Sequence, residues 1–138
     1  LNAVSPKRNV TLILVSNLHC GVVDAINYTC SFSKDVRACY VSLDPQTTEK
    51  LRRDWLKVEN RVSLVILDSP DRSVFQPILK FIEEIQNQED SPWVTVVIPE
   101  FIVEKWWENF LHNQSALFIK TYLMFKKGVV VTSVRYHL

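Results

Sequence analysis

The chain has 138 residues, a length that suits one domain built around a single hydrophobic core. Hydrophobic residues make up 47% and charged residues 22% of it, which excludes an intrinsically disordered chain. The formal net charge of +1 gives no argument for a protein that binds nucleic acid or an anionic membrane surface. No run of ~20 apolar residues is present, so no transmembrane helix is expected. Because residue 1 is Leu and not Met, we expect the chain to be a fragment or a processed product.

The first half of the sequence alternates between strand patterns and helix patterns. The expected elements are a strand over residues 9–16, a helix over 20–32, a strand over 36–43 and a helix over 46–57. The strands are rich in β-branched and apolar residues, as buried strands are. The second helix carries many charged residues, so most of it should face water, with Leu51 and Trp55 turned inward.

The second half continues the alternation. The expected elements are a strand over residues 63–67, a helix capped by Ser73 with Val74, Ile78, Ile82 and Ile85 at helical spacing, a strand over 93–98, a helix over 115–125 and a strand over 128–134. Nearly continuous hydrophobic strands separated by helices predict an α/β fold. We therefore expect one domain over residues 1–138, a doubly wound, five-stranded parallel Rossmann-like sheet with helices on both faces.

A parallel sheet of this kind binds ligands at the carboxyl ends of its strands. The polar residues expected at those ends are Ser16, Asn17, His19, Asp44, Ser69, Arg72, Asn113, Gln114 and Ser115. The stretch of residues 113–115 leads into a helix, where free backbone N–H groups can hold an anion, and the alternative is plain helix capping by Asn113 or Ser115, which the sequence alone favours. Arg72 suits a phosphate or is a solvated loop charge. Asp44 suits a sugar hydroxyl or an adenine amino group, or it forms the turn before Pro45.

The sequence contains no motif that indicates a catalytic site, a metal site or a disulfide. Gly21 and Gly128 are the two glycines, so no glycine-rich phosphate loop exists, and no G-x-S-x-G motif is present. The three histidines are not spaced as metal ligands. We expect no enzyme and no metal site. The cysteines at positions 20, 30 and 39 are odd in number and are expected to be small buried hydrophobes in a reducing cytosol.

An aromatic stretch precedes the predicted fourth helix. It contains Trp106, Trp107 and Phe110. Two interpretations remain open for it: a lid packed on the core, or a contact with a neighbouring subunit or an attached domain.

The predicted order of elements resembles the universal stress protein fold. Members of that family that bind nucleotides carry a Gly-x-x-Gly stretch followed further on by Gly-Ser. The corresponding region here, residues 99–115, contains no glycine, and Asn113-Gln114-Ser115 stands in place of the Gly-Ser phosphate contact. Tight binding of ATP is therefore not expected from this resemblance.

A second resemblance covers the whole chain. It rests on the strings LDP (residues 43–45), TEKLRRDW (48–55), SPDRSV (69–74), VIPEF (97–101), WW (106–107), LHNQSA (111–116), GVVVTSV (128–134) and YHL (136–138). Together they are similar to the cytoplasmic C-terminal domain of bacterial permeases in the amino acid–polyamine–organocation superfamily, in which the KUP type imports potassium with protons. One departure is Arg135, where that pattern has proline.

The second resemblance implies a function as well as a fold. In potassium importers of this kind the cytoplasmic domains pair, and cyclic di-AMP binds there and stops transport. The resemblance thus implies a regulatory domain on the cytoplasmic face of the cell membrane, a homodimer, an attached transmembrane domain, and cyclic di-AMP as ligand at the nine polar residues above. Two alternatives stay open: an ATP-binding domain of universal stress protein type, and a ligand-free dimerisation module of an amino acid permease.

Overall fold

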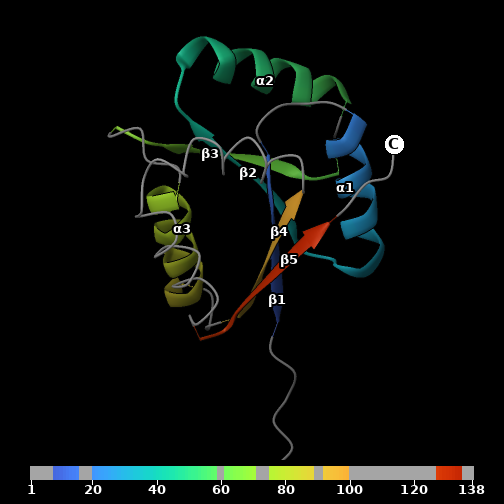
Figure 1. Ribbon diagram of the computed structural model, residues 1–138, viewed down its shortest axis with the longest axis vertical. Coiled ribbons are helices and arrows are strands. Elements are labelled where there is room, and N and C mark those ends of the chain that lie inside the picture. Colours follow the sequence, from blue (N-terminus) through green and yellow to red (C-terminus); the bar gives the residue numbers. More distant parts are fainter. Residues whose placement is uncertain are drawn as a thin grey trace, which may run out of the picture.

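The structure is a computed structural model in which residues 8–15, 20–58, 61–70, 75–88, 92–99 and 127–134 are described. In chain order the elements are β1 (Asn9–Leu14), α1 (Cys20–Phe32), β2 (Val36–Ser42), α2 (Pro45–Val58), β3 (Ser63–Asp68), α3 (Phe75–Gln88), β4 (Trp93–Pro99) and β5 (Val129–Val134). The strands form one parallel five-stranded sheet in the order β3-β2-β1-β4-β5 (Figure 1). This confirms the predicted α/β sheet.

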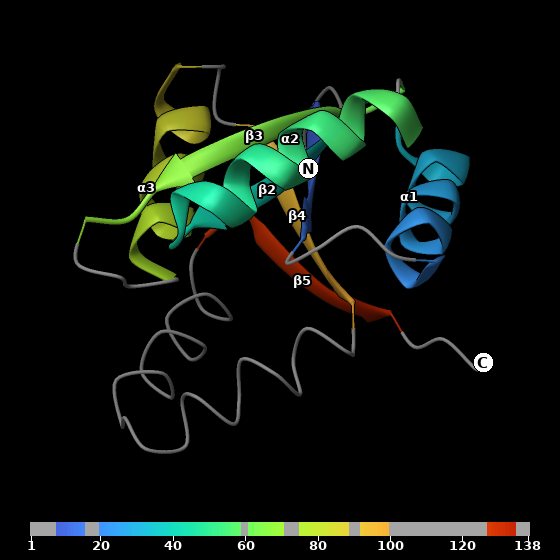
Figure 2. The ribbon, with the colours of Figure 1, turned by 90° about the horizontal axis from the view of Figure 1, so that it is seen from above.

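Helices cover both faces of the sheet. On one face, Ile78, Ile82 and Ile85 of α3 pack against apolar residues of β1, β2 and β4. On the other face, α1 and α2 pack against alternate residues of the same strands, with Leu51 and Trp55 buried as predicted. Figure 2 shows α3 and α1 at opposite sides of the sheet, with α2 lying along β3. The doubly wound arrangement follows from these two clusters.

Several element boundaries differ from those predicted. The first strand ends at Leu14 rather than at residue 16, and the second at Ser42 rather than at residue 43. Val15 is fully buried outside the strand, so its apolar character reflects burial and not strand geometry. The helix α2 begins at Pro45, because proline suits the first turn of a helix, where its missing N–H has no partner to lose. The predicted helix over residues 115–125 lies outside the described residues.

The last strand begins one residue later than predicted because Gly128 occupies a turn. Its φ of +82° lies in the left-handed region, which glycine adopts without strain. The carbonyl oxygen of Gly128 accepts a hydrogen bond from the backbone N–H of Val94 at 2.8 Å, which ties this turn to β4.

Two of the three cysteines can be placed. Cys39 is buried and Cys30 is half-buried, and neither forms a disulfide. Burial raises the pKa of the Cys39 thiol from 9.0 to about 12, against a smaller opposite influence of the Arg37 charge. Cys39 is therefore a neutral core residue, as expected, whereas Cys30 is only partly enclosed. Nothing is described of the side chain of Cys20.

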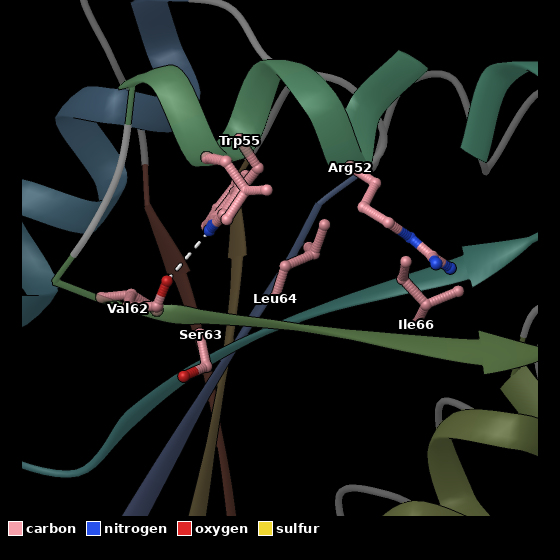
Figure 3. A pocket seen from close by; sticks show the side chains of 7 residues that line it. Arg52, Trp55, Val62, Ser63, Leu64 and Ile66 are labelled. Atoms are coloured by element: carbon pink, nitrogen blue, oxygen red, sulfur yellow. Dashed lines mark hydrogen bonds between the residues drawn. The ribbon is translucent and has the colours of Figure 1, made fainter. Parts of the chain in front are cut away.

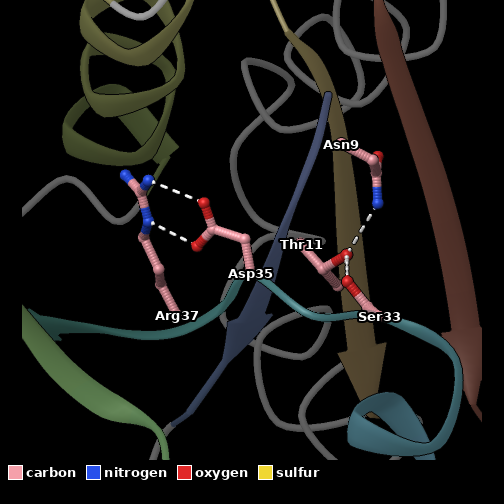
Figure 4. A network of polar contacts seen from close by, with 5 residues as sticks. All are labelled: Asn9, Thr11, Ser33, Asp35 and Arg37. Carbon is pink, nitrogen blue, oxygen red and sulfur yellow. Dashed lines mark hydrogen bonds and ion pairs between the residues drawn. The ribbon is translucent and has the colours of Figure 1, made fainter. Parts of the chain in front are cut away.

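A polar network lies at the end of the sheet where strands β1 and β2 begin (Figure 4). The hydroxyl of Thr11 is fully buried, lies 2.8 Å from the hydroxyl of Ser33 and accepts a hydrogen bond from the Asn9 amide at 3.0 Å. Beside it, Arg37 forms two hydrogen bonds of 3.1 Å with the Asp35 carboxylate. The contact between Thr11 and Ser33 links the end of α1 to β1. The pair of Asp35 and Arg37 stabilises the start of β2 beside it.

Candidate ligand-binding site

The order of the strands defines where a ligand site is expected. From β1 the chain moves to β2 and β3 on one side and then returns to β4 on the other, so the reversal lies between β1 and β4. Ligands of open α/β sheets bind outside the carboxyl ends of the strands at this point, where the connections diverge.

The register makes β1 shorter than its neighbours at this edge. Leu14, the last residue of β1, pairs with Cys39, whereas β2 continues to Ser42, which pairs with Asp68 of β3. On the other side β4 continues to Pro99. β1 therefore ends before its neighbours β2 and β4 at the carboxyl end of the sheet, which leaves a step in the outline of the sheet at β1.

Asp44 is the predicted site residue nearest to this step whose side chain is described. It is exposed and follows β2, the neighbour of β1. Its carboxylate caps α2: the backbone N–H of Gln46 donates to Oδ1 at 3.2 Å, and the hydroxyl of Thr47 donates to Oδ2 at 2.6 Å. Both oxygens are thus used within the protein, and a ligand group would share them.

Two polar residues near Asp44 were not predicted. The hydroxyls of Ser42 and Thr48 lie 2.7 Å apart, and the Thr48 hydroxyl donates to the carbonyl oxygen of Asp44 at 2.8 Å. This places the first turn of α2 directly against the end of β2. The spacing Asp-Pro-x-Thr-Thr over residues 44–48, which supplies a capping carboxylate and two hydroxyls at a helix start, is the sequence pattern that indicates them.

Ser69 lies farther from the reversal point. It is half-buried and follows β3, two strands away from β1, which corresponds to about 10 Å across the sheet. Asp44 and Ser69 thus share one edge of the sheet, and Asp44 is the nearer of the two. The other predicted site residues lie outside the described residues: Ser16, Asn17, His19, Arg72, Asn113, Gln114 and Ser115.

A pocket of 680 Å³ lies elsewhere, between α2 and β3 (Figure 3). It is lined by Arg52, Trp55, Leu56, Val62, Ser63, Leu64 and Ile66. Trp55 and Arg52 point from the helix toward the strand, and the indole N–H of Trp55 donates to the carbonyl oxygen of Val62 at 2.9 Å. The pocket is mostly apolar and does not include Asp44 or Ser69, so it is distinct from the carboxyl edge.

Neither a metal centre nor a membrane-crossing helix is found in the part of the chain that the structure describes. Within it, no three His, Cys, Asp or Glu residues gather closely enough to hold a metal ion. None of its helices has the length and hydrophobicity needed to cross a membrane.

Comparison with known proteins shows a similarity to a potassium transporter. The chain is 35% identical over 133 residues to the potassium transporter KimA of Bacillus subtilis (strain 168). This alignment covers 95% of the chain but 22% of the relative, so the chain spans about a fifth of the length of the protein it matches.

A family model matches nearly the whole chain. It describes the C-terminal domain of the KimA potassium transporter and matches residues 7–136. All five strands and all three described helices fall inside this range. The chain therefore belongs to the family of KimA potassium transporter C-terminal domains.

Proposed function

We propose that this chain is the regulatory domain of a potassium permease, that it binds cyclic di-AMP at the carboxyl edge of its sheet, and that the bound ligand inhibits transport. The observation that carries the proposal is the family match over residues 7–136. On this proposal the domain lies at the cytoplasmic face of the cell membrane and pairs with a second copy. The attached transmembrane part of the same polypeptide carries the potassium pathway.

The sheet offers a suitable place for a nucleotide. The step at the end of β1 coincides with the reversal of strand order, and one residue separates Ser16 from Leu14 in the sequence. Cyclic di-AMP carries adenine amino groups and two phosphates, which need acceptors and donors respectively. In the proposed site Asp44 accepts from an amino group, while Arg72 and residues 113–115 hold the phosphates.

Inhibition requires that the ligand prefers one arrangement of the transporter. A ligand shifts an equilibrium only by the difference between its affinities for the two states. We propose that cyclic di-AMP binds the pair of domains more tightly in a non-transporting arrangement. The attached helices are then restrained from the movement that transport needs.

The proposed site is tested in the intact transporter. The double variant Arg72→Ala/Asn113→Ala is expected to take up potassium normally and to lose inhibition by cyclic di-AMP. The matched control Arg53→Ala/Asn87→Ala changes the same residue types at exposed positions of α2 and α3, so it should retain inhibition. Unchanged inhibition in the first variant would refute the site.

Two other functions are separated by the choice of ligand. An ATP-binding domain predicts that ATP binds and cyclic di-AMP does not. A ligand-free dimerisation module predicts that neither binds and that transport is insensitive to both nucleotides whether the domain is present or removed.

A further inference from the structure

Four large hydrophobic side chains are exposed on the α1 face of the sheet, toward β5. Tyr28 and Phe32 of α1 are 52% and 55% exposed, and their rings contact edge to face with centroids 5.1 Å apart. Trp93 of β4 and Val130 of β5 are 46% and 47% exposed. We call these four residues the exposed apolar patch.

The strand register places Trp93 and Val130 on the α1 face. Val97 of β4 packs in the core cluster that contains Val22 and Ile26 of α1. Side chains two residues apart on a strand point to the same face, so Thr95 and Trp93 share this side. Val130 pairs with Thr95, and paired residues of neighbouring strands face the same way.

The helix presents Tyr28 and Phe32 toward the same region. Asn27 accepts a hydrogen bond from Arg61, which precedes β3, so the flank of α1 with Asn27 faces the β3 side of the sheet. At about 100° per residue, Tyr28 and Phe32 lie on the opposite flank, beyond the buried line of Ile26. They therefore face the β5 side.

The end of α1 lies at the same height along the strands as Trp93 and Val130. Ser33 follows the helix, and its hydroxyl lies 2.8 Å from that of Thr11 in β1. Thr11 pairs with Thr95, which in turn pairs with Val130. The end of the helix, Trp93 and Val130 thus border one area of the sheet.

The two faces of β5 are covered differently. Val129 and Val131 pack against the core cluster formed with α3. Between them, Val130 points to the α1 face and is 47% exposed. Among the described elements, β5 packs chiefly against β4, and the exposure of Val130 shows that its α1 face is partly open. Figure 1 shows α1 standing to one side of β5.

The start of β1 lies at the border of the patch. The backbone N–H of Trp93 donates to the carbonyl oxygen of Arg8 at 2.9 Å, so the polypeptide enters β1 at the border of the patch. The family is that of a C-terminal domain, and the chain spans 22% of the length of its relative. Any part of the polypeptide that precedes this domain is tethered through the start of β1, and the tether keeps it at a high effective concentration near the patch.

We propose that the exposed apolar patch is the docking surface for an apolar helix of the transporter part that precedes this domain in the same polypeptide. Aromatic side chains held against each other edge to face suit such an interface, because they bury a large area at a small cost in conformational entropy. The inference rests on the proposed function in one respect, namely that the domain is attached to a transporter. It does not depend on the ligand.

Cysteine accessibility tests this docking. Val130→Cys is introduced into the full-length transporter and into the isolated chain, and the rate of reaction with a maleimide at residue 130 is followed by peptide mass spectrometry. The reaction should be at least about tenfold slower in the full-length protein. A tenfold change corresponds to a docked state that is favoured over the undocked state by about 1.4 kcal/mol. Leu56→Cys, at a position 77% exposed on α2, is the control and should react at similar rates in both proteins.

Two outcomes overturn the proposal. Equal rates at residue 130 in both proteins show that nothing docks on the patch. Protection that is present in the isolated chain and grows with its concentration shows that a second copy covers the patch instead. Phe32→Cys, in α1, gives an independent reading if the β5 variant does not fold.

The maleimide experiment is carried out without nucleotide, so its result is independent of a separate measurement of cyclic di-AMP binding. The docking proposal and the ligand proposal can therefore fail separately. Protection of residue 130 without any binding of cyclic di-AMP would leave the docking surface standing and refute the proposed ligand. Binding of cyclic di-AMP without protection of residue 130 would refute the docking surface and leave the proposed ligand standing.

Discussion

The indole N–H of Trp55 donates a hydrogen bond of 2.9 Å to the backbone carbonyl oxygen of Val62, which links the last turns of α2 to the residue before β3. Both residues are nearly inaccessible to solvent, at 3% and 4% exposure. A buried carbonyl that loses its donor retains the full cost of desolvation. This bond therefore fixes how α2 lies on the sheet, and with it the position of Asp44 at the start of the same helix.

Trp55→Phe should lower the free energy of unfolding by about 1–2 kcal/mol, because it keeps a large ring but removes the donor. Urea unfolding followed by circular dichroism measures the loss. Leu56→Ala, at an exposed neighbouring position, should change stability by less than about 0.5 kcal/mol. Equal effects of the two changes would show that the hydrogen bond contributes nothing.

Gly128→Ala should destabilise the fold by about 1–2 kcal/mol, because a φ of +82° strains any residue with a Cβ. The added Cβ would also lie 3.1 Å from Nε2 of Gln86, a side chain whose amide donates to the carbonyl oxygen of Lys127. Thermal unfolding is the measurement. A melting temperature equal to that of the parent would contradict the strained turn.

Asp44 has two roles that substitution can separate. Asp44→Ala removes the helix cap and should cost about 1 kcal/mol of stability, whereas Asp44→Asn keeps an acceptor for the first turn of α2 and should cost much less. If the carboxylate also contacts the ligand, Asp44→Asn should weaken cyclic di-AMP binding while stability is largely retained. Titration calorimetry of the two variants compares these effects. Unchanged affinity in both variants would restrict Asp44 to capping.

Cys39 should make stability fall at high pH. Its thiol pKa is about 12 in the folded chain against 9.0 ordinarily, because of burial, so the unfolded chain loses this proton first. The contribution of the Cys39 thiol to the free energy of unfolding is fully present below pH 9.0 and is lost as the pH rises toward about 12. Urea unfolding of the parent and of Cys39→Ala from pH 8 to pH 10.5 should show a steeper loss in the parent. Parallel curves would contradict the shift.

Local sequence patterns were sufficient for most of the described fold. The helix over residues 20–32 has the predicted bounds, because apolar residues recur at helical spacing over its full length. Strand ends were less certain, since Val15 is as apolar as the strand before it yet lies beyond it. Hydrophobicity reports burial, and it does not distinguish a strand from the buried residue that follows one.

The candidate site was less predictable than the fold. Asp44 was identified by its place after a strand, but its bonds to Gln46 and Thr47 follow from the conformation of the helix start. The contact of Ser42 with Thr48 depends on how α2 packs on β2, which residue types alone do not encode. The pairing of Thr11 with Ser33 joins segments that meet only after the sheet has formed.

Binding of cyclic di-AMP is the property of this domain on which the proposed function depends. Calorimetric titration of the purified chain with cyclic di-AMP, with ATP and cyclic di-GMP as controls, tests it most directly. Cyclic di-AMP is expected to bind with a dissociation constant of about 1 μM or tighter, equivalent to about 8 kcal/mol, and neither control is expected to bind comparably. Absence of binding heat with cyclic di-AMP, in a chain shown to be folded, would refute cyclic di-AMP as the ligand of this domain.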